Sequence, residues 1–404
     1  MRALQKKFTN YKIPQALIEK GLYSFYHAIE SGQDTVVKMK GKEILMFGSN
    51  SYLGLTNHPE LVKAASEAIQ KYGTGASGSR LMNGNLDLHV ELEEKLADFV
   101  NKPAATVFST GFQTNLGVIS SMVGRNDYII LDEKNHASII EGSRLTFAKT
   151  LKYRHNDMDS LEKLLRKTDR DQTTLIVIDG VFSMEGDVAR LDKICDLADE
   201  YGASVMVDDA HALGVIGENG SGTASHYGLT DRTDLIMGTF SKSLASLGGF
   251  IAGDFDTINY IKHNARSLLF SASIPPSAAA TVLKALDVIK AEPNRLTNLW
   301  DNTDYARKCL TQEGFELGQS TTPILPIFIG DDINTYKYAT WLLDNGVYVN
   351  PIVHPAVDKG RAILRFSLMA THTRAQIDFA VEKIVKCREL IDRKNVPEYI
   401  EASL

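Results

Sequence analysis

Short apolar segments alternate with longer amphipathic segments through the middle of the chain. Uninterrupted apolar runs are typical of strands that are buried on both faces of a sheet. They fall at Ala105–Phe108, Tyr128–Leu131, Leu175–Ile178, Val205–Val207, Leu235–Met237 and Phe250–Ala252. The stretches between them are long enough for helices. This alternation predicts a mostly parallel sheet that is covered by helices.

The two ends of the chain show other patterns. Residues 12–32 predict a helical N-terminal arm, and Val36 to Phe47 predicts a hairpin that turns at Lys40-Gly41-Lys42. Two amphipathic helices are predicted next, at Pro59–Tyr72 and Leu88–Val100. The first has Pro near its start and Gly73 just after its end, as helices often do.

The pattern changes again near residue 290 and predicts a smaller α+β region. Helices are predicted near Leu296–Glu313 and from Thr373 to Arg393, and strands near Ile324–Ile329 and Ile363–Ser367. We therefore expect an arm and hairpin over residues 1–58, a large domain over 59–290 and a small domain over 291–404. The last eleven residues are predicted to form a loose tail.

Composition narrows the class of protein. With 404 residues, 44% of them hydrophobic, the chain can bury a large core. The net charge of −6, without a long basic run, argues against nucleic-acid binding. Three scattered cysteines predict neither a disulfide framework nor a zinc site. The N-terminus lacks a signal peptide, and no apolar run reaches the length of a membrane span. We expect a cytoplasmic protein, and peripheral contact with the inner membrane stays open.

Polar side chains follow two of the predicted strands. Asp208 and His211 come after the run Val205–Val207, and Ser241 with Lys242 comes after Leu235–Met237. Ligands bind at the carboxyl ends of the strands in such sheets, so these groups are predicted to converge. A lysine and a carboxylate are what pyridoxal phosphate (PLP) needs, for a Schiff base and for its protonated pyridine nitrogen. A surface lysine, or a metal site that includes Asp209, is the alternative.

Two further segments fit a phosphate-bearing flat ring. Ser109–Asn115 follows a strand and starts a helix, and free N–H groups at a helix start suit a phosphate. His136 follows another strand and could stack on a ring. A plain capped helix and a loop histidine are the alternatives. Gly73–Gly78 matches the spacing GxGxxG, but it follows a helix instead of a strand, which argues against a dinucleotide site.

Taken together, these segments resemble the α-oxoamine synthase family of PLP enzymes. The resemblance runs from about residue 20 to residue 390, and seven motifs occur in the family's order. They are Ser49–Leu55, Gly73–Arg80, His136–Ser138, Phe182–Asp187, Val207–His211, Thr239–Lys242 and Leu364–His372. The resemblance implies the aspartate-aminotransferase-like fold (fold type I), with a large mostly parallel sheet domain and a smaller C-terminal α+β domain.

The resemblance also implies a role for each cofactor residue. Lys242 would hold PLP covalently, Asp208 would pair with the pyridinium nitrogen, and His136 would stack over the ring. These three are the implied catalytic residues. Near the phenolic oxygen the resemblance places His211 and Ser183. At the phosphate it places Gly111, Phe112, Thr239 and Ser241 of one subunit with Ser271 and Ala272 of its neighbour. It therefore implies a homodimer with shared active sites, and it includes no metal.

For the substrates, the resemblance implies that Arg365 grips the amino-acid carboxylate, with Asn50, Tyr52 and Ser79 nearby. The implied reaction is a decarboxylating condensation of an amino acid with an acyl thioester. L-serine with palmitoyl-CoA, giving 3-ketodihydrosphingosine for sphingolipid synthesis, is the pair that the motifs favour. Cysteate, glycine or alanine stay as alternatives, as does a non-catalytic binding subunit. His354 departs from the Pro-rich loop of some members, which leaves acyl selection open.

Overall fold

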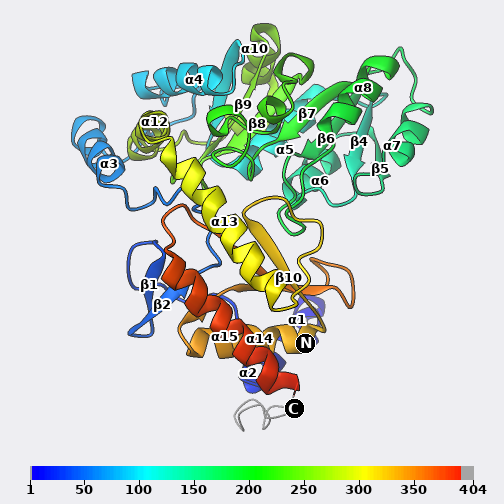
Figure 1. Ribbon diagram of the computed structural model, residues 1–404. Helices are drawn as coiled ribbons and strands as arrows, with labels where there is room; N and C mark the ends of the chain where they lie inside the picture. The colour runs from blue at the N-terminus through cyan, green and yellow to red at the C-terminus, as the bar shows by residue number, and fades with distance from the viewer. Residues whose placement is uncertain (1, 393–404) are drawn as a thin grey trace. The chain divides into compact units, whose positions relative to one another are not determined.

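The computed structural model describes residues 2–392, which form two compact units (Figure 1). The large unit comprises residues 50–299 and 321–323. The small unit comprises residues 2–49, 300–320 and 324–392 of the described chain. The three-part division at residues 58 and 290 stays a prediction, and the predicted tail lies outside the described residues.

A seven-stranded sheet forms the centre of the large unit, in the order β3-β9-β8-β7-β6-β4-β5. The strands are β3 (Ala104–Phe108), β4 (Tyr128–Asp132), β5 (Lys149–Tyr153), β6 (Thr174–Asp179), β7 (Ser204–Asp208), β8 (Leu235–Thr239) and β9 (Gly249–Gly253). Strands β8, β7, β6, β4 and β5 run parallel, and β9 is antiparallel to both of its neighbours. The predicted mostly parallel sheet is confirmed, together with all six of its predicted strands.

The strand that the sequence did not predict is β5, at one edge of the sheet. The central strands of the sheet, such as β6, are buried along their whole length, as an uninterrupted apolar run requires. In β5 most side chains are exposed and only Tyr153 is buried. An edge strand needs no apolar run, so the pattern that found the other strands could not find this one.

Helices cover the sheet and lead the chain from one strand to the next. The helices are α3 (Pro59–Tyr72), α4 (Asp87–Phe99), α5 (Gly111–Met122), α6 (Ala137–Arg144), α7 (Met158–Leu165), α8 (Leu191–Tyr201), α9 (Thr223–His226), α10 (Phe255–Asn264), α11 (Arg266–Leu269) and α12 (Pro276–Ala291). Apolar side chains of α5, α6, α10 and α11 form one buried cluster with β4, β6, β7, β8 and β9. The two helices predicted before the sheet correspond to α3 and α4.

The small unit holds two three-stranded sheets. The predicted hairpin is confirmed as β1 (Val36–Met39) and β2 (Lys42–Met46), which pair antiparallel. Its turn residues Lys40 and Gly41 have φ of 49° and 73°, and positive φ at both positions is typical of a tight hairpin turn. The remaining strands are β10 (Ile324–Gly330), β11 (Val347–Tyr348), β12 (Asn350–Ile352) and β13 (Ala362–Ser367).

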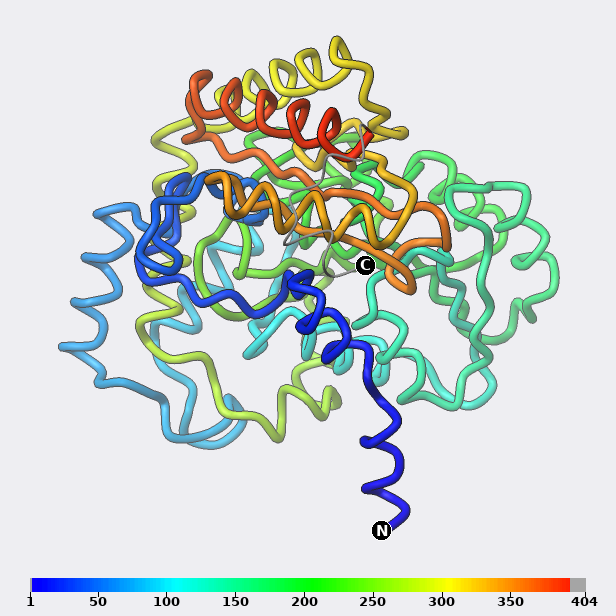
Figure 2. The backbone as a smooth tube through the Cα atoms, turned by 90° about the horizontal axis from the view of Figure 1, so that it is seen from below, coloured from blue at the N-terminus to red at the C-terminus, as the bar shows by residue number. Residues whose placement is uncertain are grey.

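Helices α14 (Asp332–Asp344) and α15 (Arg374–Asp392) belong to the small unit, whereas α13 (Asn294–Gln312) starts in the large unit and enters the small unit at residue 300. Helices α13 and α15, both predicted, lie side by side in Figures 1 and 2, and Tyr305 Oη donates to Asp378 across them at 2.6 Å. No helix among residues 2–392 is long and apolar enough to cross a membrane.

The helical arm predicted over residues 12–32 is only partly right. Helix α1 (Ala3–Thr9) precedes it and has no buried residue. Within the arm only α2 (Ile13–Glu19) is helical. Gly21 ends it at a φ of 63°, where Leu22 N donates to Leu17 O at 2.8 Å and Gly21 N to Ile18 O at 3.0 Å. This is the Schellman pattern of helix ends, which the helical periodicity alone did not reveal.

Candidate active site

A cavity of about 290 Å³ lies in the large unit, at the carboxyl ends of the parallel strands. It brings together many of the predicted site residues. Those that line it are Gly111, Phe112, His136, Asp208, His211, Thr239, Ser241 and Lys242. They come from the segments that follow β3, β4, β7 and β8. The convergence expected at the strand ends is therefore present.

Asp208 ends β7 and is buried, with 3% of its surface exposed. Its Oδ1 accepts from Ala210 N at 2.9 Å, and its Oδ2 accepts from Asn115 Nδ2 at 2.7 Å. The register of β6 and β7 sets Asp179 beside it. Burial, and then the charge of Asp208, raise the pKa of Asp179 well above its usual range. Two carboxyl groups from neighbouring strands thus line the cavity.

His136 begins α6 and caps its first turn. Its Nδ1 accepts from Ser138 N at 3.2 Å and lies 2.7 Å from Ser138 Oγ, while its own backbone N–H donates to Asp179 Oδ2 at 2.7 Å. Burial lowers the pKa of His136, and the positive charge of Lys242 lowers it further against the opposite effect of Asp208. We expect a neutral imidazole at neutral pH, with Nδ1 engaged by Ser138.

His211 has a buried partner of its own. Tyr52 is fully buried, and its Oη lies 2.7 Å from Nδ1 of His211. The two rings meet edge to face. Tyr52, which the resemblance placed near the substrate, therefore contacts a cofactor-site histidine. Tyr52 therefore engages Nδ1 of His211 and helps to orient the imidazole at the edge of the cavity.

The start of α5 and the end of β8 form a cradle for an anion. Thr110 caps α5 by accepting from Gln113 N at 3.1 Å, and the amides of Gly111 and Phe112 precede the first intrahelical bond. A Cβ at Gly111 would lie 2.8 Å from Thr239 Oγ1, which is too close for a side chain. Thr239 Oγ1 in turn lies 3.0 Å from Ser241 Oγ. Helix-start amides beside hydroxyl groups suit a phosphate.

Several predicted residues do not line this cavity. Ser183 lies in the turn after β6. Ser271 accepts from Gln113 Nε2 at 3.2 Å, and Ala272 O accepts from Ser109 Oγ, so this stretch contacts the start of α5 in its own chain. Ser79 lies beside it, since Ser273 N donates to Gly78 O at 3.0 Å. Asn50 precedes Tyr52 in the large unit.

Arg365 belongs to the small unit, on the central strand β13. It is buried, and its Nη1 donates to Ser367 Oγ at 2.9 Å. Its convergence with Lys242 on one substrate therefore stays a prediction.

The metal alternative finds no geometric support around Asp209. This residue is fully buried, and its Oδ2 accepts from Thr223 N at 2.8 Å. Burial raises the pKa of Asp209 to about 7. Over residues 2–392, no three or more His, Cys, Asp or Glu side chains gather in a way that could hold a metal ion.

Sequence reasoning missed the residues that connect the site. Asn115 Nδ2 donates to Asp208 and also to Ser138 Oγ at 2.8 Å, so a continuous hydrogen-bonded chain joins Asp208 to His136. Asp179 supports the backbone of His136. Asp179 ends an apolar strand just as Asp208 does, and that signal could have found it. A buried amide such as Asn115 has no comparable signal in one sequence.

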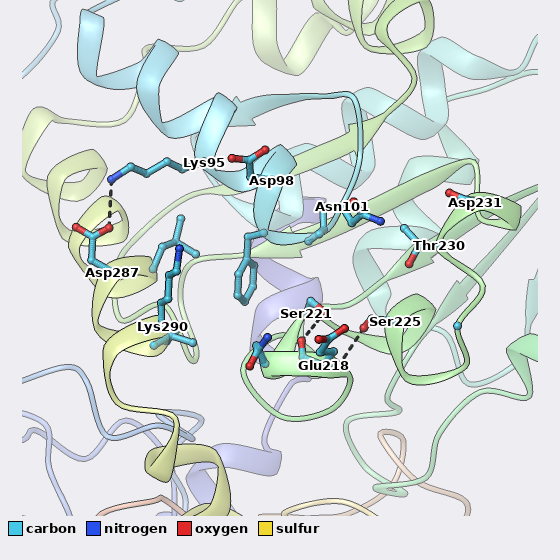
Figure 3. A pocket seen from close by; sticks show the side chains of 16 residues that line it. Lys95, Asp98, Asn101, Glu218, Ser221, Ser225, Thr230, Asp231, Asp287 and Lys290 are labelled. Carbon is cyan, nitrogen blue, oxygen red and sulfur yellow. Dashed lines mark hydrogen bonds and ion pairs between the residues drawn. The ribbon is translucent and has the colours of Figure 1, made fainter.

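A larger cavity of about 870 Å³ lies elsewhere in the large unit (Figure 3). It is open and is lined by α4, α12 and residues between Glu218 and Asp231. Figure 3 shows the ion pair between Lys95 and Asp287, at 3.2 Å, on its wall. None of the predicted site residues lines it. Size alone therefore does not identify the site, and the smaller cavity carries the convergent polar groups.

A mostly parallel α/β sheet with a buried acid and a lysine at the ends of neighbouring strands defines the class of fold type I enzymes. The family profile for aminotransferase class I and II matches residues 42–384. The chain is 57% identical over 383 residues to a serine palmitoyltransferase of Sphingobacterium spiritivorum, covering 95% of this chain and 96% of that one. It is 42% identical over 387 residues to an 8-amino-7-oxononanoate synthase of Alkaliphilus metalliredigens, covering 96% and 98%.

A solved structure of serine palmitoyltransferase (SPT) with its PLP internal aldimine superposes on this chain with a TM-score of 0.94. The two sequences are 34% identical, and the match covers 97% of this chain and 100% of that one. The chain belongs to the aminotransferase class I and II family, and its relatives place it among the α-oxoamine synthases. The fold type and the family resemblance predicted from the motifs are confirmed.

Replacing Asn115 by Leu is expected to weaken PLP binding roughly 10- to 100-fold. The change removes the donor to Asp208 and Ser138, and hydrogen bonds to charged groups are worth about 1.5–3 kcal/mol. Titration of the apoprotein with PLP, followed by absorbance, measures the dissociation constant. Asn264→Leu, on the exposed end of α10, is the matched control. An unchanged constant in Asn115→Leu would remove Asn115 from the site.

Proposed function

We propose that the protein catalyses the PLP-dependent, decarboxylating condensation of L-serine with palmitoyl-CoA. The product is 3-ketodihydrosphingosine, the first intermediate of sphingolipid synthesis. The observation that carries the proposal is the convergence of Lys242, Asp208 and His136 in one cavity, in a chain that is 57% identical to a serine palmitoyltransferase. That the chain is a PLP-dependent enzyme of acyl transfer follows from its family and its relatives.

The residues of the cavity fit PLP. Asp208 offers a buried carboxylate for a protonated ring nitrogen, and Lys242 offers an amine for the aldehyde. The cradle at Gly111, with Thr239 and Ser241 beside it, offers donors for the phosphate. When bound, PLP supplies an electron sink that stabilises negative charge at the α-carbon of an amino acid.

The protein's own side chains then handle the protons and the substrate carboxylate. Lys242 is proposed to remove the proton from the α-carbon, and His136 to act on the thioester carbonyl, for which a neutral imidazole is suited. Asp208 would keep the ring nitrogen of bound PLP protonated, and the donors Ala210 N and Asn115 Nδ2 hold its carboxylate in place. Arg365 is proposed to bind the carboxylate, because a guanidinium fork matches its two oxygens.

Another amino acid is the second candidate. A relative with another name, an 8-amino-7-oxononanoate synthase, is 42% identical to this chain over 387 residues. Cysteate, glycine and alanine are therefore tested beside serine. A location in the cytoplasm, with or without contact to the inner membrane, stays a prediction.

We also propose a homodimer with shared active sites. Large apolar side chains are exposed around the anion cradle and the stretch that contains Ser271 and Ala272. They are Leu81, Met82, Phe112 and Phe270, with between 44% and 77% of their surface exposed. A second copy of the chain would bury them, since isolated soluble chains rarely expose so many together.

Titration of the PLP-loaded enzyme tests the substrate. L-serine is expected to change the visible spectrum at lower concentration than L-cysteate, L-alanine or glycine, and later addition of palmitoyl-CoA is expected to release thiol. Lys242→Ala should lose the lysine-bound absorbance and all turnover, whereas Lys290→Ala, on an exposed site of α12, should keep both. A stronger response to another amino acid would identify that amino acid as the substrate in place of serine. Full turnover in Lys242→Ala would contradict the proposed PLP-dependent reaction.

Arg365→Ala is expected to raise the KM for the amino acid roughly 10- to 100-fold, with a smaller change in kcat. The estimate corresponds to the loss of about 1.5–3 kcal/mol of charged hydrogen bonds. Arg361→Ala removes an exposed guanidinium just before the same strand and is the matched control. Steady-state kinetics with varied amino acid measure both constants. Equal KM values in the two variants would exclude Arg365 from carboxylate binding.

Sedimentation velocity is expected to show a dimer at micromolar concentration. The double variant Met82→Asp, Phe270→Asp places charges on the exposed apolar residues and should shift the protein towards monomer with loss of bound PLP. Phe255→Asp, an exposed residue at the start of α10, should leave the dimer intact. A wild-type monomer that binds PLP fully would contradict the shared site.

A further inference from the structure

A charged cluster lies next to the segment between β4 and α6, which carries His136. The imidazole of His155 bridges two carboxylates, with Nδ1 at 3.0 Å from Asp132 Oδ1 and Nε2 at 3.0 Å from Asp187 Oδ2. Asp132 is fully buried, and the side chains of His155 and Asp187 are 19% and 16% exposed. The edge of the Phe182 ring packs against the imidazole, with ring centroids 4.4 Å apart.

Each carboxylate belongs to a different segment beside the active site. Asp132 ends β4, and its Oδ1 also accepts from Lys134 N at 2.9 Å, two residues before His136. Its Oδ2 accepts from Asn156 N at 2.9 Å. The side chain therefore fixes the path of the chain from β4 to the start of α6.

Asp187 closes the turn after β6 that contains Ser183. Phe182 N donates to Asp187 O at 3.0 Å, and Gly186 N donates to Phe182 O at 2.8 Å. Asn156 Nδ2 donates to Asp187 Oδ2 at 2.9 Å. The turn is thus tied to the segment after β5, which supplies both Asn156 and His155.

The cluster requires a charged imidazole. A neutral ring would present a lone pair to one carboxylate, whereas the imidazolium donates to both. Although burial lowers it, the two carboxylates raise the pKa of His155 to about 10. Other titratable groups face these segments: Glu133, whose carboxylate accepts from His155 N at 3.0 Å, the ion pair of Lys134 with Glu185 at 3.1 Å, and Tyr153 and Asp179, which both interact with Asp132. That ion pair joins the same two segments a second time.

We propose that His155 is a positioning residue. Through Asp132 and Asp187 it fixes the segment that carries His136 relative to the turn that contains Ser183. This inference rests on the role proposed for His136 at the cofactor ring. Paired charges of this kind add little net stability compared with apolar packing, but they fix the relative position of the groups that they join. A catalytic side chain that is displaced by about 1 Å can lose much of its rate.

A double-mutant cycle in the PLP-loaded enzyme tests the inference. His155→Gln removes the charge and one of the two bridges, and is expected to lower kcat at least tenfold and to change the visible circular dichroism of bound PLP. In the His136→Ala background, the same change is expected to alter kcat and the dichroism less than twofold, because its effect passes through His136. His263→Gln, an exposed histidine on α10 whose Nδ1 contacts Asn259 O at 2.8 Å, is the matched control.

Two results would overturn the inference. One is an equal fold-loss in both backgrounds, and the other is an unchanged kcat and dichroism in His155→Gln. If that variant does not fold, Asp187→Asn, which keeps the shape of the side chain, enters the same cycle with the same expectations. The dichroism needs no substrate, so it tests the positioning role even where the proposed substrates fail.

The pH dependence of unfolding provides a separate check. The pKa of His155 is raised by folding, so the stability that it contributes is complete below the ordinary histidine value of 6.5 and is lost as pH rises through about 10. The urea midpoints of wild type and His155→Gln are expected to differ most below the ordinary histidine pKa of 6.5 and to converge above pH about 10. A constant difference across this range would contradict the bridge.

Discussion

Two buried carboxyl groups at the ends of neighbouring strands impose the main constraint on this site. Asp179 and Asp208 lie side by side because β6 and β7 are parallel and in register. Buried acids need donors, and the structure supplies them from elements on both sides: Asn115 from α5 and the backbone of His136 from the start of α6. The same donors fix the orientation of the acid and of the histidine, so satisfying the carboxyl groups also builds the cavity.

The parts of the fold that followed from the sequence are those with one dominant local signal. Central strands such as β6 are buried along their whole length, and the residues Lys40 and Gly41 by themselves predict the hairpin turn. The edge strand β5 and the end of α2 lack such a signal. The first depends on a neighbouring strand and the second on a backbone conformation at Gly21, and neither is visible in hydrophobic periodicity.

The site divides in a similar way. Lys242, Asp208 and His136 could be proposed because each lies at or just after the end of an apolar strand, and the family motifs then gave their implied roles. Asn115, and the bridge of His155 between Asp132 and Asp187, depend on contacts between residues that lie 23 to 93 positions apart in the sequence. Only three-dimensional geometry reveals such partners.

The polar edge strand has a consequence for handling the protein. A sheet that ends in exposed backbone groups can add a strand from another molecule and so seed aggregates. Here β5 carries Lys149 and Lys152 on that edge. Two molecules that meet along β5 would bring these positive charges together, so the sheet is protected from growing at this side. Replacing both lysines by apolar residues is expected to favour pairing of β5 between two molecules and so to promote aggregation at high protein concentration.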